Sequence, residues 1–499
     1  MSYSNCFALV ATSLLLEEIE QQIEELWEQQ KLQLVASVAD LLRGEVTPEI
    51  NFQFEEELQK TLNEIGRLLT QFAYNHLEDD PHALPKHVWF EGGFYRRLNQ
   101  KTRNQHVANR FGKIVLWRFA YRDDQTGDRC VFPLEIALGL VEGATPALAD
   151  RVARYMAETG ATQRRGLERL KQDHGVNWGV KRLRNFTRLQ AERMDAFRHQ
   201  MQVARVLELL EEARKSKGKC KPVLSVGRDG ITLCSQPHSF WEVATAATIT
   251  VYDRRGKRLG TVYLGYPPEL GQHTMSEQLT RLIRDILTAW EGPLPRLCYV
   301  TDAGASETEY YRTVLRRMKH PRTDSRLSWY RIIDYYHAAE RITTMSEKLF
   351  GKGTRECQSW SRRMRKLLLK PNGPYRVLHS AAALLSRREL SESAQEDFDR
   401  AYNYIRRRTK FMDYAGYRNL HLPIGSGVTE AACKTLFTER LKLSGMRWKQ
   451  AGASSILKLR VIHLSGIWEA VREAMLQSDT EGLPRPHASN SKAAFATAA

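Results

Sequence analysis

Between residues 219 and 350 the chain alternates strand-like and helix-like patterns in an order that few folds allow. Three strand-like runs come first, followed by a helix, a strand, a second helix and a last strand. The strands are expected at 223–226, 247–252, 259–264, 297–300 and 329–333, and the helices at 276–290 and 308–318. The short turn at 253–257 makes the second and third strands antiparallel, whereas the helical crossovers are long enough for parallel pairing. We therefore predict an α/β domain with a mixed sheet.

Two aspartates stand at the ends of predicted strands. Asp229 ends the first strand and is followed by Gly230, and Asp302 ends the fourth and is followed by Ala303 and Gly304. Either aspartate alone would be interpreted as a turn residue. If the first and fourth strands are neighbours, however, the two carboxylates face each other at one edge, and the small residues beside them leave room for a substrate backbone. Clustered carboxylates repel unless a proton or cation lies between them, and Mg²⁺ prefers oxygen ligands.

A third acidic candidate, Glu430, lies one turn into a helix that is expected to begin at Ser426, a reasonable N-cap. By itself Glu430 would be interpreted as a surface acid. Basic and aromatic residues follow it along the chain, namely Lys434, Arg440, Lys442, Arg447 and Trp448. A helix with one acid among such residues can hold a metal ion and bind DNA phosphates.

The sequence before this last helix, residues 351–424, is strongly basic and helical in pattern, which predicts an all-helical insertion. Some of its arginines are expected on solvated helix faces. Their density among tyrosines and phenylalanine favours a surface that follows phosphates and stacks on bases. The interleaved aromatic residues are Tyr402, Tyr404, Phe411, Tyr414 and Tyr417. We expect the final part of the core at 425–475 and a disordered tail, rich in Ser, Pro and Ala, at 476–499.

The first 110 residues are expected to form a helical N-terminal region, acidic as far as about residue 75, that packs on its own domain, although a dimer seam remains an alternative. Residues 111–218 contain a helix at 162–174, Gly175 and then a basic helix, which is the pattern of a helix-turn-helix. Many helical hairpins share this pattern without reading DNA. The basic residues of the second helix, which favour DNA binding, are Lys181, Arg182, Arg184 and Arg188.

The overall charge and the cysteines narrow the class of protein. Lys and Arg number 75 against 58 Asp and Glu, so the net charge of +17 favours a polyanionic partner such as nucleic acid. Seven scattered cysteines without CxxC spacing support neither a disulfide framework nor a zinc ribbon. No apolar run approaches the roughly 20 residues that span a bilayer. We therefore expect a cytoplasmic, nucleoid-associated protein without a membrane partner.

Taken together, residues 105–470 resemble DDE-type bacterial insertion-sequence transposases of the ISKra-type branch. The matching motifs are Val226–Asp229–Gly230, Val300–Asp302–Gly304, Asp334–x–x–His337, Gly425–Ser426–Gly427 through Glu430, and the segment from Arg440 to Trp448. The resemblance implies an RNase H-like core interrupted by an all-helical insertion. It also implies Mg²⁺ or Mn²⁺, two ions in all, bound by Asp229, Asp302 and Glu430. Asp334 and His337 resemble a motif of related transposases, Mutator-like ones included, and are expected in the site without binding metal.

The function that the resemblance implies is DNA cleavage and strand transfer at the terminal repeats of a mobile element. Its partners would be double-stranded DNA, both element ends and target, and further copies of the chain in a dimer or higher oligomer. Relatives carry cysteine pairs near residues 122–130, where this chain has Cys130 alone, so no zinc is inferred. Two alternatives remain: a nuclease of the same fold, and a regulatory DNA-binding protein that has lost its chemistry.

Overall fold

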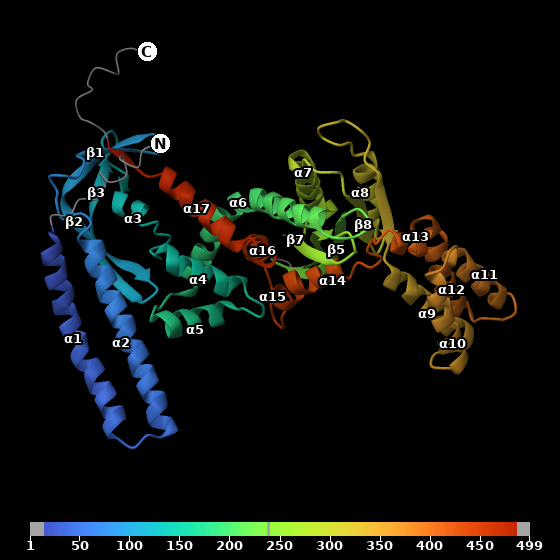
Figure 1. Ribbon diagram of the computed structural model, residues 1–499, viewed down its shortest axis with the longest axis horizontal. Coiled ribbons are helices and arrows are strands. Elements are labelled where there is room, and N and C mark those ends of the chain that lie inside the picture. Colours follow the sequence, from blue (N-terminus) through green and yellow to red (C-terminus); the bar gives the residue numbers. More distant parts are fainter. Residues whose placement is uncertain (1–13, 237–239, 487–499) are drawn as a thin grey trace, which may run out of the picture. The chain divides into compact units, whose positions relative to one another are not determined.

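The computed structural model describes residues 14–236 and 240–486, and the chain divides into two compact units (Figure 1). The first unit combines residues 1–194 with 472–499, and the second consists of residues 195–471. Both contain helices and one five-stranded sheet, so the expectation of an α/β protein is confirmed at this level. No helix in the described ranges is long and apolar enough to cross a membrane.

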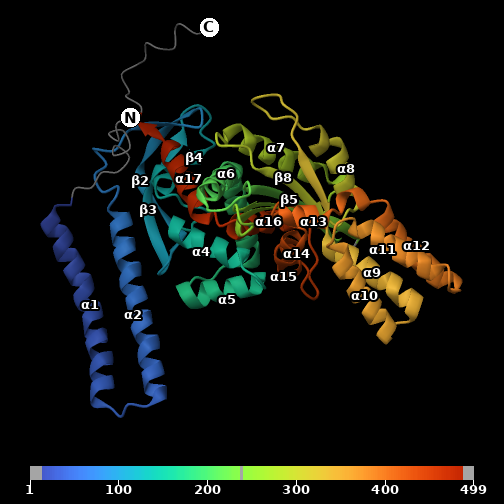
Figure 2. The same cartoon turned by 45° about the vertical axis from the view of Figure 1, so that its right-hand side comes forward.

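The first unit joins a helical hairpin to an antiparallel sheet. Helices α1 (Leu16–Arg43) and α2 (Pro48–Asn75) lie side by side (Figure 2). The sheet order is β10-β1-β2-β3-β4, with β1 at His87–Phe90, β2 at Gly93–Asn109, β3 at Gly112–Asp123, β4 at Cys130–Val131 and β10 at Arg485–Pro486. The expectation of a helical region at 1–110 is therefore confirmed for α1 and α2 but wrong for the part that β1 and β2 occupy. Strand β2 is too polar to show an apolar alternation, and its pairing with the apolar β3 is what makes it a strand.

The tail expectation is also corrected in part. The end of helix α17 (Trp468–Glu481) and strand β10, which pairs with β1, occupy residues that were expected to be disordered. Residues 487–499 lie outside the described part of the chain.

The helices expected around Gly175 are present. They are α5 (Gln163–His174) and α6 (Val180–Lys215), the second of which continues into the second unit, and α3 (Pro133–Ala137) and α4 (Pro146–Ala157) precede them. The Thr162 hydroxyl accepts a hydrogen bond from the Arg165 N–H and caps α5, and Gly175 ends it with φ 61°.

The second unit is built on a mixed sheet with the order β7-β6-β5-β8-β9. Its strands are β5 (Val223–Ser235), β6 (Phe240–Tyr252), β7 (Arg258–Tyr266), β8 (Arg296–Thr301) and β9 (Trp329–Ile333). The first three pair antiparallel, and β8 and β9 run parallel to β5, as the turn and crossover lengths predicted. Strand β5 is longer than expected, because it pairs with β6 as far as Ser235.

Alternate residues of β8 enter two separate cores. Leu297 and Tyr299 pack on one face, against α6, α7 (His273–Ala289) and the end of α8 (Ala305–Thr313). Cys298 and Val300 pack on the other face, against the helices that follow β9. This alternation is the period-2 pattern of a strand that is buried on both faces.

The segment after β9 is entirely helical, as predicted. It contains α9 (Tyr335–Phe350), α10 (Arg355–Leu368), α11 (Gly373–Leu385), α12 (Glu392–Arg406), the 3₁₀ turn η5 (Thr409–Phe411) and α13 (Tyr414–Asn419). Two of its tyrosines do not form the expected exposed stacking surface. Tyr414 and Tyr417 are buried, and their hydroxyls donate to the carbonyl oxygens of Ile333 and Arg331, so they attach the insertion to β9.

The helical segment that was expected to begin at Ser426 is broken into shorter pieces. Helix α14 (Gly427–Cys433) passes into a π-helical turn, η6 (Lys434–Thr438), and a short helix, α15 (Glu439–Leu441), before α16 (Gln450–Leu464). The intervening loop pairs with the end of β5, where the Gln236 N–H donates to the Trp448 carbonyl oxygen at 2.9 Å. This backbone pairing takes the loop residues out of the helix.

Candidate functional site

The register between β5 and β8 brings the two predicted aspartates to neighbouring positions. Gly227 pairs with Val300, so Asp229 and Asp302, each two residues further on, leave that ladder at the same edge. Asp302 follows β8 directly, as predicted. Asp229 lies within β5 and does not end it, because β5 keeps pairing with β6 beyond this point. Their carboxylates accept hydrogen bonds from the N–H groups of Gly230 at 2.7 Å and Gly304 at 3.0 Å, respectively.

Helix α14 adds Glu430 to this edge by packing directly on β5 and β6. The close approach depends on Gly227, because a Cβ at this position would lie 1.9 Å from Thr429 Oγ1. Thr429 also forms a buried hydrogen bond with Thr248 of β6, with 2.8 Å between the hydroxyl oxygens. Glu430, the next residue, is thereby held beside β5 although 128 positions separate it from Asp302 in the sequence.

The electrostatics of Asp229 reflect this crowding of acids. Burial raises the pKa of its carboxyl group, and the negative charges of Asp302 and Glu430 raise it further. The Gly230 N–H and the Cys433 thiol, which donate to the carboxylate, lower the pKa in the opposite direction.

A fourth acid, Glu307, was not among the predicted site residues. It lies in the first turn of α8, is 8% exposed, and has a pKa that burial raises and the charge of Asp302 raises further. Gly304 makes room for it, since a Cβ there would lie 2.2 Å from Glu307 Oε2. The available signal was its position five residues after Asp302, at the start of the helix that follows a strand.

The predicted pair Asp334 and His337 lies beside Glu430. Asp334 is fully buried and caps α9 by accepting a hydrogen bond from the His337 N–H at 2.8 Å. Burial alone would raise the pKa of Asp334, but hydrogen bonds from His337 and Ser426 outweigh it and lower the pKa to about 2. Asp334 is therefore a permanent anion at neutral pH.

Ser426 links Asp334 to Glu430. Its hydroxyl oxygen lies 2.6 Å from Asp334 Oδ2 and 2.6 Å from Glu430 Oε1, and its N–H also donates to Asp334. A hydroxyl carries one proton, so it donates to one of the two carboxylates at a time. Ser426 is the N-cap residue of α14, as expected, but its side chain makes no capping hydrogen bond, because its hydroxyl is used in this link.

His337 is the positive group of the cluster. Its Nδ1 lies 3.5 Å from Asp334 Oδ1 and 3.8 Å from Glu430 Oε1. The Asp334 carboxylate raises the pKa of His337 to about 9, so the ring is protonated at neutral pH. In the described chain, the three residues whose ligand atoms all lie within 4.8 Å are Asp334, His337 and Glu430, a group that contains neither Asp229 nor Asp302.

Two contacts from the helical insertion hold the loop after β8. The Tyr404 hydroxyl donates to the Asp302 carbonyl oxygen at 2.6 Å, and Arg408 donates to the Ala303 carbonyl oxygen at 3.4 Å. Ala303 adopts φ 68°, a left-handed conformation that costs a non-glycine residue free energy and is common where a structure constrains a functional loop. Tyr404 was expected to stack on nucleic acid, but its hydroxyl positions this loop.

The predicted DNA-binding residues differ in how available they are. Lys181, Arg184 and Arg188 are exposed on α6, whereas Arg182 donates to the carbonyl oxygens of Glu142 and His106 and stacks on Trp178. Lys434, Lys442 and Arg447 are also exposed. Arg440 is fully buried over the Trp448 ring, and the Trp448 indole donates to the Leu441 carbonyl oxygen. The expectation that Arg440 contacts DNA is therefore not compatible with its burial.

The predicted acids thus occupy one region of the second unit. Asp229 and Asp302 leave neighbouring strands at one edge, Glu430 reaches that edge from α14, and Ser426 connects Glu430 to Asp334. No protein-family model matches this chain, and no curated protein matches it.

Proposed function

We propose that the protein is a DDE-type transposase with an RNase H-like core, which cleaves DNA at element ends and transfers the strands. The observation that carries the proposal is the parallel pairing of β5 with β8, which makes Asp229 and Asp302 neighbours, together with the packing of α14 that adds Glu430. The strand order β7-β6-β5-β8-β9, with an antiparallel half and a parallel half, is the order expected for an RNase H-like sheet. An all-helical insertion before the final acid agrees with the same family.

The acidic residues fit a hard divalent cation such as Mg²⁺ or Mn²⁺. Asp229, Asp302 and Glu430 offer only oxygen atoms, and a cation would relieve the burial and repulsion that raise the pKa of Asp229. When bound, two such ions would activate a water molecule or a 3′-hydroxyl and stabilise the leaving oxygen. We treat Asp334 and His337 as site residues that do not bind the metal, since Asp334 already accepts hydrogen bonds from the N–H groups of His337 and Ser426.

The residues around the acids would orient them and balance their charge. Ser426 sets the position of Glu430 through its 2.6 Å hydrogen bond, and Tyr404 holds the Asp302 backbone. The protonated His337 ring is 30% exposed, so it can offset the charge of Glu430 and donate a hydrogen bond to a phosphate oxygen.

The proposed substrate is double-stranded DNA. The net charge of +17 favours a polyanion, and exposed basic residues on α6, η6 and the loop after α15 can contact phosphates. Cleavage and joining at two element ends require two active sites, so we propose a dimer or higher oligomer on DNA.

The test uses labelled duplexes taken from both flanks of the reading frame, incubated with Mg²⁺ or Mn²⁺ and the purified chain. We expect cleavage and joining by the wild type, loss of both with EDTA, and loss of at least roughly a hundredfold in the Asp302→Asn variant. Asp324→Asn, at an exposed position outside the site, is the matched control and should keep full activity.

The outcomes separate the proposal from its alternatives. Cutting without joining would identify a nuclease of the same fold. Specific binding of the flanking DNA without cleavage would identify a regulatory protein. Equal cleavage by the wild type and the Asp302→Asn variant would refute the assignment of the acidic site.

A further inference from the structure

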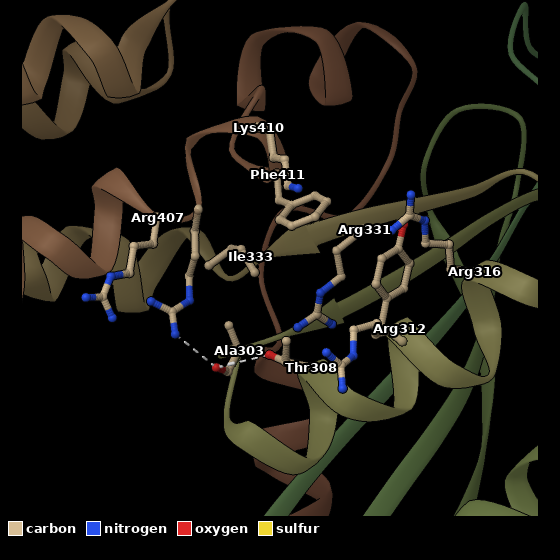
Figure 3. A pocket seen from close by; sticks show the side chains of 11 residues that line it. Ala303, Thr308, Arg312, Arg316, Arg331, Ile333, Arg407, Lys410 and Phe411 are labelled. Carbon is tan, nitrogen blue, oxygen red and sulfur yellow. Dashed lines mark hydrogen bonds between the residues drawn. The ribbon is translucent and has the colours of Figure 1, made fainter.

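A basic cavity lies next to the acidic site, on the side formed by α8, β9 and η5 (Figure 3). Its volume is about 330 Å³, which is within the range of small-molecule pockets. Ala303, the residue after Asp302, forms part of its wall. The cavity and the acids therefore share one loop.

The wall of this cavity carries only positive charge. Of the 11 lining residues, six are Arg or Lys and none is Asp or Glu. Arg316 and Arg407 are exposed at its margin, on the turn after α8 and after α12. Phe411, from η5, is also part of the wall, and its ring contacts Tyr311 edge-on. The loop of Asp302 and Ala303 thus joins the acidic residues to a cavity whose charge attracts anions.

Arg331 is the most informative of these residues. It is 3% exposed, and neither Nη1 nor Nη2 has a hydrogen-bond partner among the residues that the structure describes. Its guanidinium stacks over the rings of Tyr299 at 4.7 Å and Tyr311 at 5.5 Å, which supports the flat faces but leaves the N–H groups unsatisfied. A buried guanidinium whose two terminal nitrogens lack hydrogen bonds is costly, so the site is arranged for an anion that supplies acceptors.

Phosphate is the anion that suits this arrangement. A guanidinium presents its N–H groups in a planar fork that matches phosphate oxygens. Several such forks around one space, with an aromatic ring in the wall, are typical of sites that bind the phosphate and sugar of a nucleotide. We infer that the cavity binds one phosphate of the DNA strand while the neighbouring phosphate of the same strand reaches Asp302. This inference rests on the proposed function.

The experiment compares two double variants with the same change in charge. Arg316→Gln with Arg407→Gln removes two cavity arginines, and Arg317→Gln with Arg406→Gln removes their exposed sequence neighbours, which do not line the cavity. Binding of a fluorescent single-stranded tetrathymidylate is measured by anisotropy at low salt without divalent metal. Its uncharged methylphosphonate analogue and thymidine monophosphate serve as further probes.

We expect the cavity variant to bind tetrathymidylate at least roughly tenfold more weakly, and the matched variant to stay within about twofold of the wild type. The methylphosphonate analogue should not bind, and thymidine monophosphate should bind more weakly than the tetranucleotide. Equal weakening in both double variants, or in neither, would overturn the inference. So would equally tight binding of the monophosphate and the tetranucleotide, because the site would then take a free nucleotide.

Arg331→Gln is a second variant for the buried position, with its folding checked by thermal melting. If it folds, we expect loss of tetrathymidylate binding, and unchanged binding would contradict the inference. If it does not fold, the comparison of the cavity double variant with the matched double variant decides. The binding assay needs neither metal nor cleavage, so it is independent of the proposed enzymatic activity. Tetranucleotide binding without strand cleavage would count against the proposed function alone. Strand cleavage without tetranucleotide binding in the cavity would count against this inference alone.

Discussion

Gly227 controls how closely α14 approaches the sheet, and Gly227→Ala therefore tests how Glu430 is positioned. An alanine Cβ would lie 1.9 Å from Thr429 Oγ1, 2.9 Å from Thr248 Oγ1 and 3.1 Å from Thr429 Cβ. Ordinary contact begins near 3.4 Å. The helix would have to retreat by about 3.4 − 1.9 = 1.5 Å, or the buried Thr429–Thr248 hydrogen bond would have to break.

Both responses cost free energy and displace Glu430. Overpacking of a buried contact typically destabilises a protein by about 1–3 kcal/mol. A displacement of about 1 Å at a catalytic group can reduce the rate roughly a hundredfold. We therefore expect Gly227→Ala to remain folded, with a lower melting temperature, and to lose about two orders of magnitude of metal-dependent cleavage.

The assay combines thermal melting with cleavage of the labelled flanking duplex. Gly265→Ala on β7 is the matched control, because its Cβ would meet Leu436 and Val461 no closer than 3.3 Å. Adding Thr429→Ala to Gly227→Ala removes the closest atom and should recover part of the activity. Full cleavage by the Gly227→Ala single variant would show that the position of α14 does not matter for the reaction.

Two further substitutions test the electrostatics and the loop. Glu78 is 1% exposed, and burial raises its pKa to about 7 although the Phe119 N–H donates to its carboxylate. The contribution of Glu78 to stability is therefore greatest below pH 4.5, the pKa of the group in the unfolded chain, and it falls as the pH rises towards 7. In denaturant titrations, Glu78→Gln should stabilise the chain by up to about 3 kcal/mol at pH 8 and have little effect at pH 4. Equal effects at both pH values would contradict this. Tyr404→Phe removes the hydrogen bond to the Asp302 carbonyl oxygen. We expect the single-turnover cleavage rate to fall about tenfold, and thermal melting to show a loss of only about 1 kcal/mol of stability. An unchanged rate would mean that the loop after β8 is held without this hydrogen bond.

The strands and helices of the second unit were predictable because their signals are local. Short strand-like runs marked β5 to β9, and the apolar spacing of α7 marked an amphipathic helix. The short turn and the long crossovers then determined which neighbours are antiparallel and which are parallel. For the same reason the position of Asp302 immediately after β8 could be read from the sequence.

Strand β2 and the length of β5 could not be read in this way. Strand β2 is polar along most of its length, and it is a strand because β3 satisfies its backbone. Gly227–Gly230 has the composition of a turn, yet β6 continues the ladder through it, which puts Asp229 inside the strand. In both cases the partner that supplies the hydrogen bonds is elsewhere in the chain.

The basic residues show most clearly that burial cannot be predicted from the local sequence. Arg440 and Lys442 are both basic and two positions apart, but one is buried under Trp448 and the other is exposed. Arg331 lies in an ordinary strand pattern, and its lack of hydrogen-bond partners follows from the tyrosines packed around it. Local residue patterns specified the elements and two aspartates of the site. The packing of distant segments determined which charges are buried, because burial depends on atoms that no local window contains.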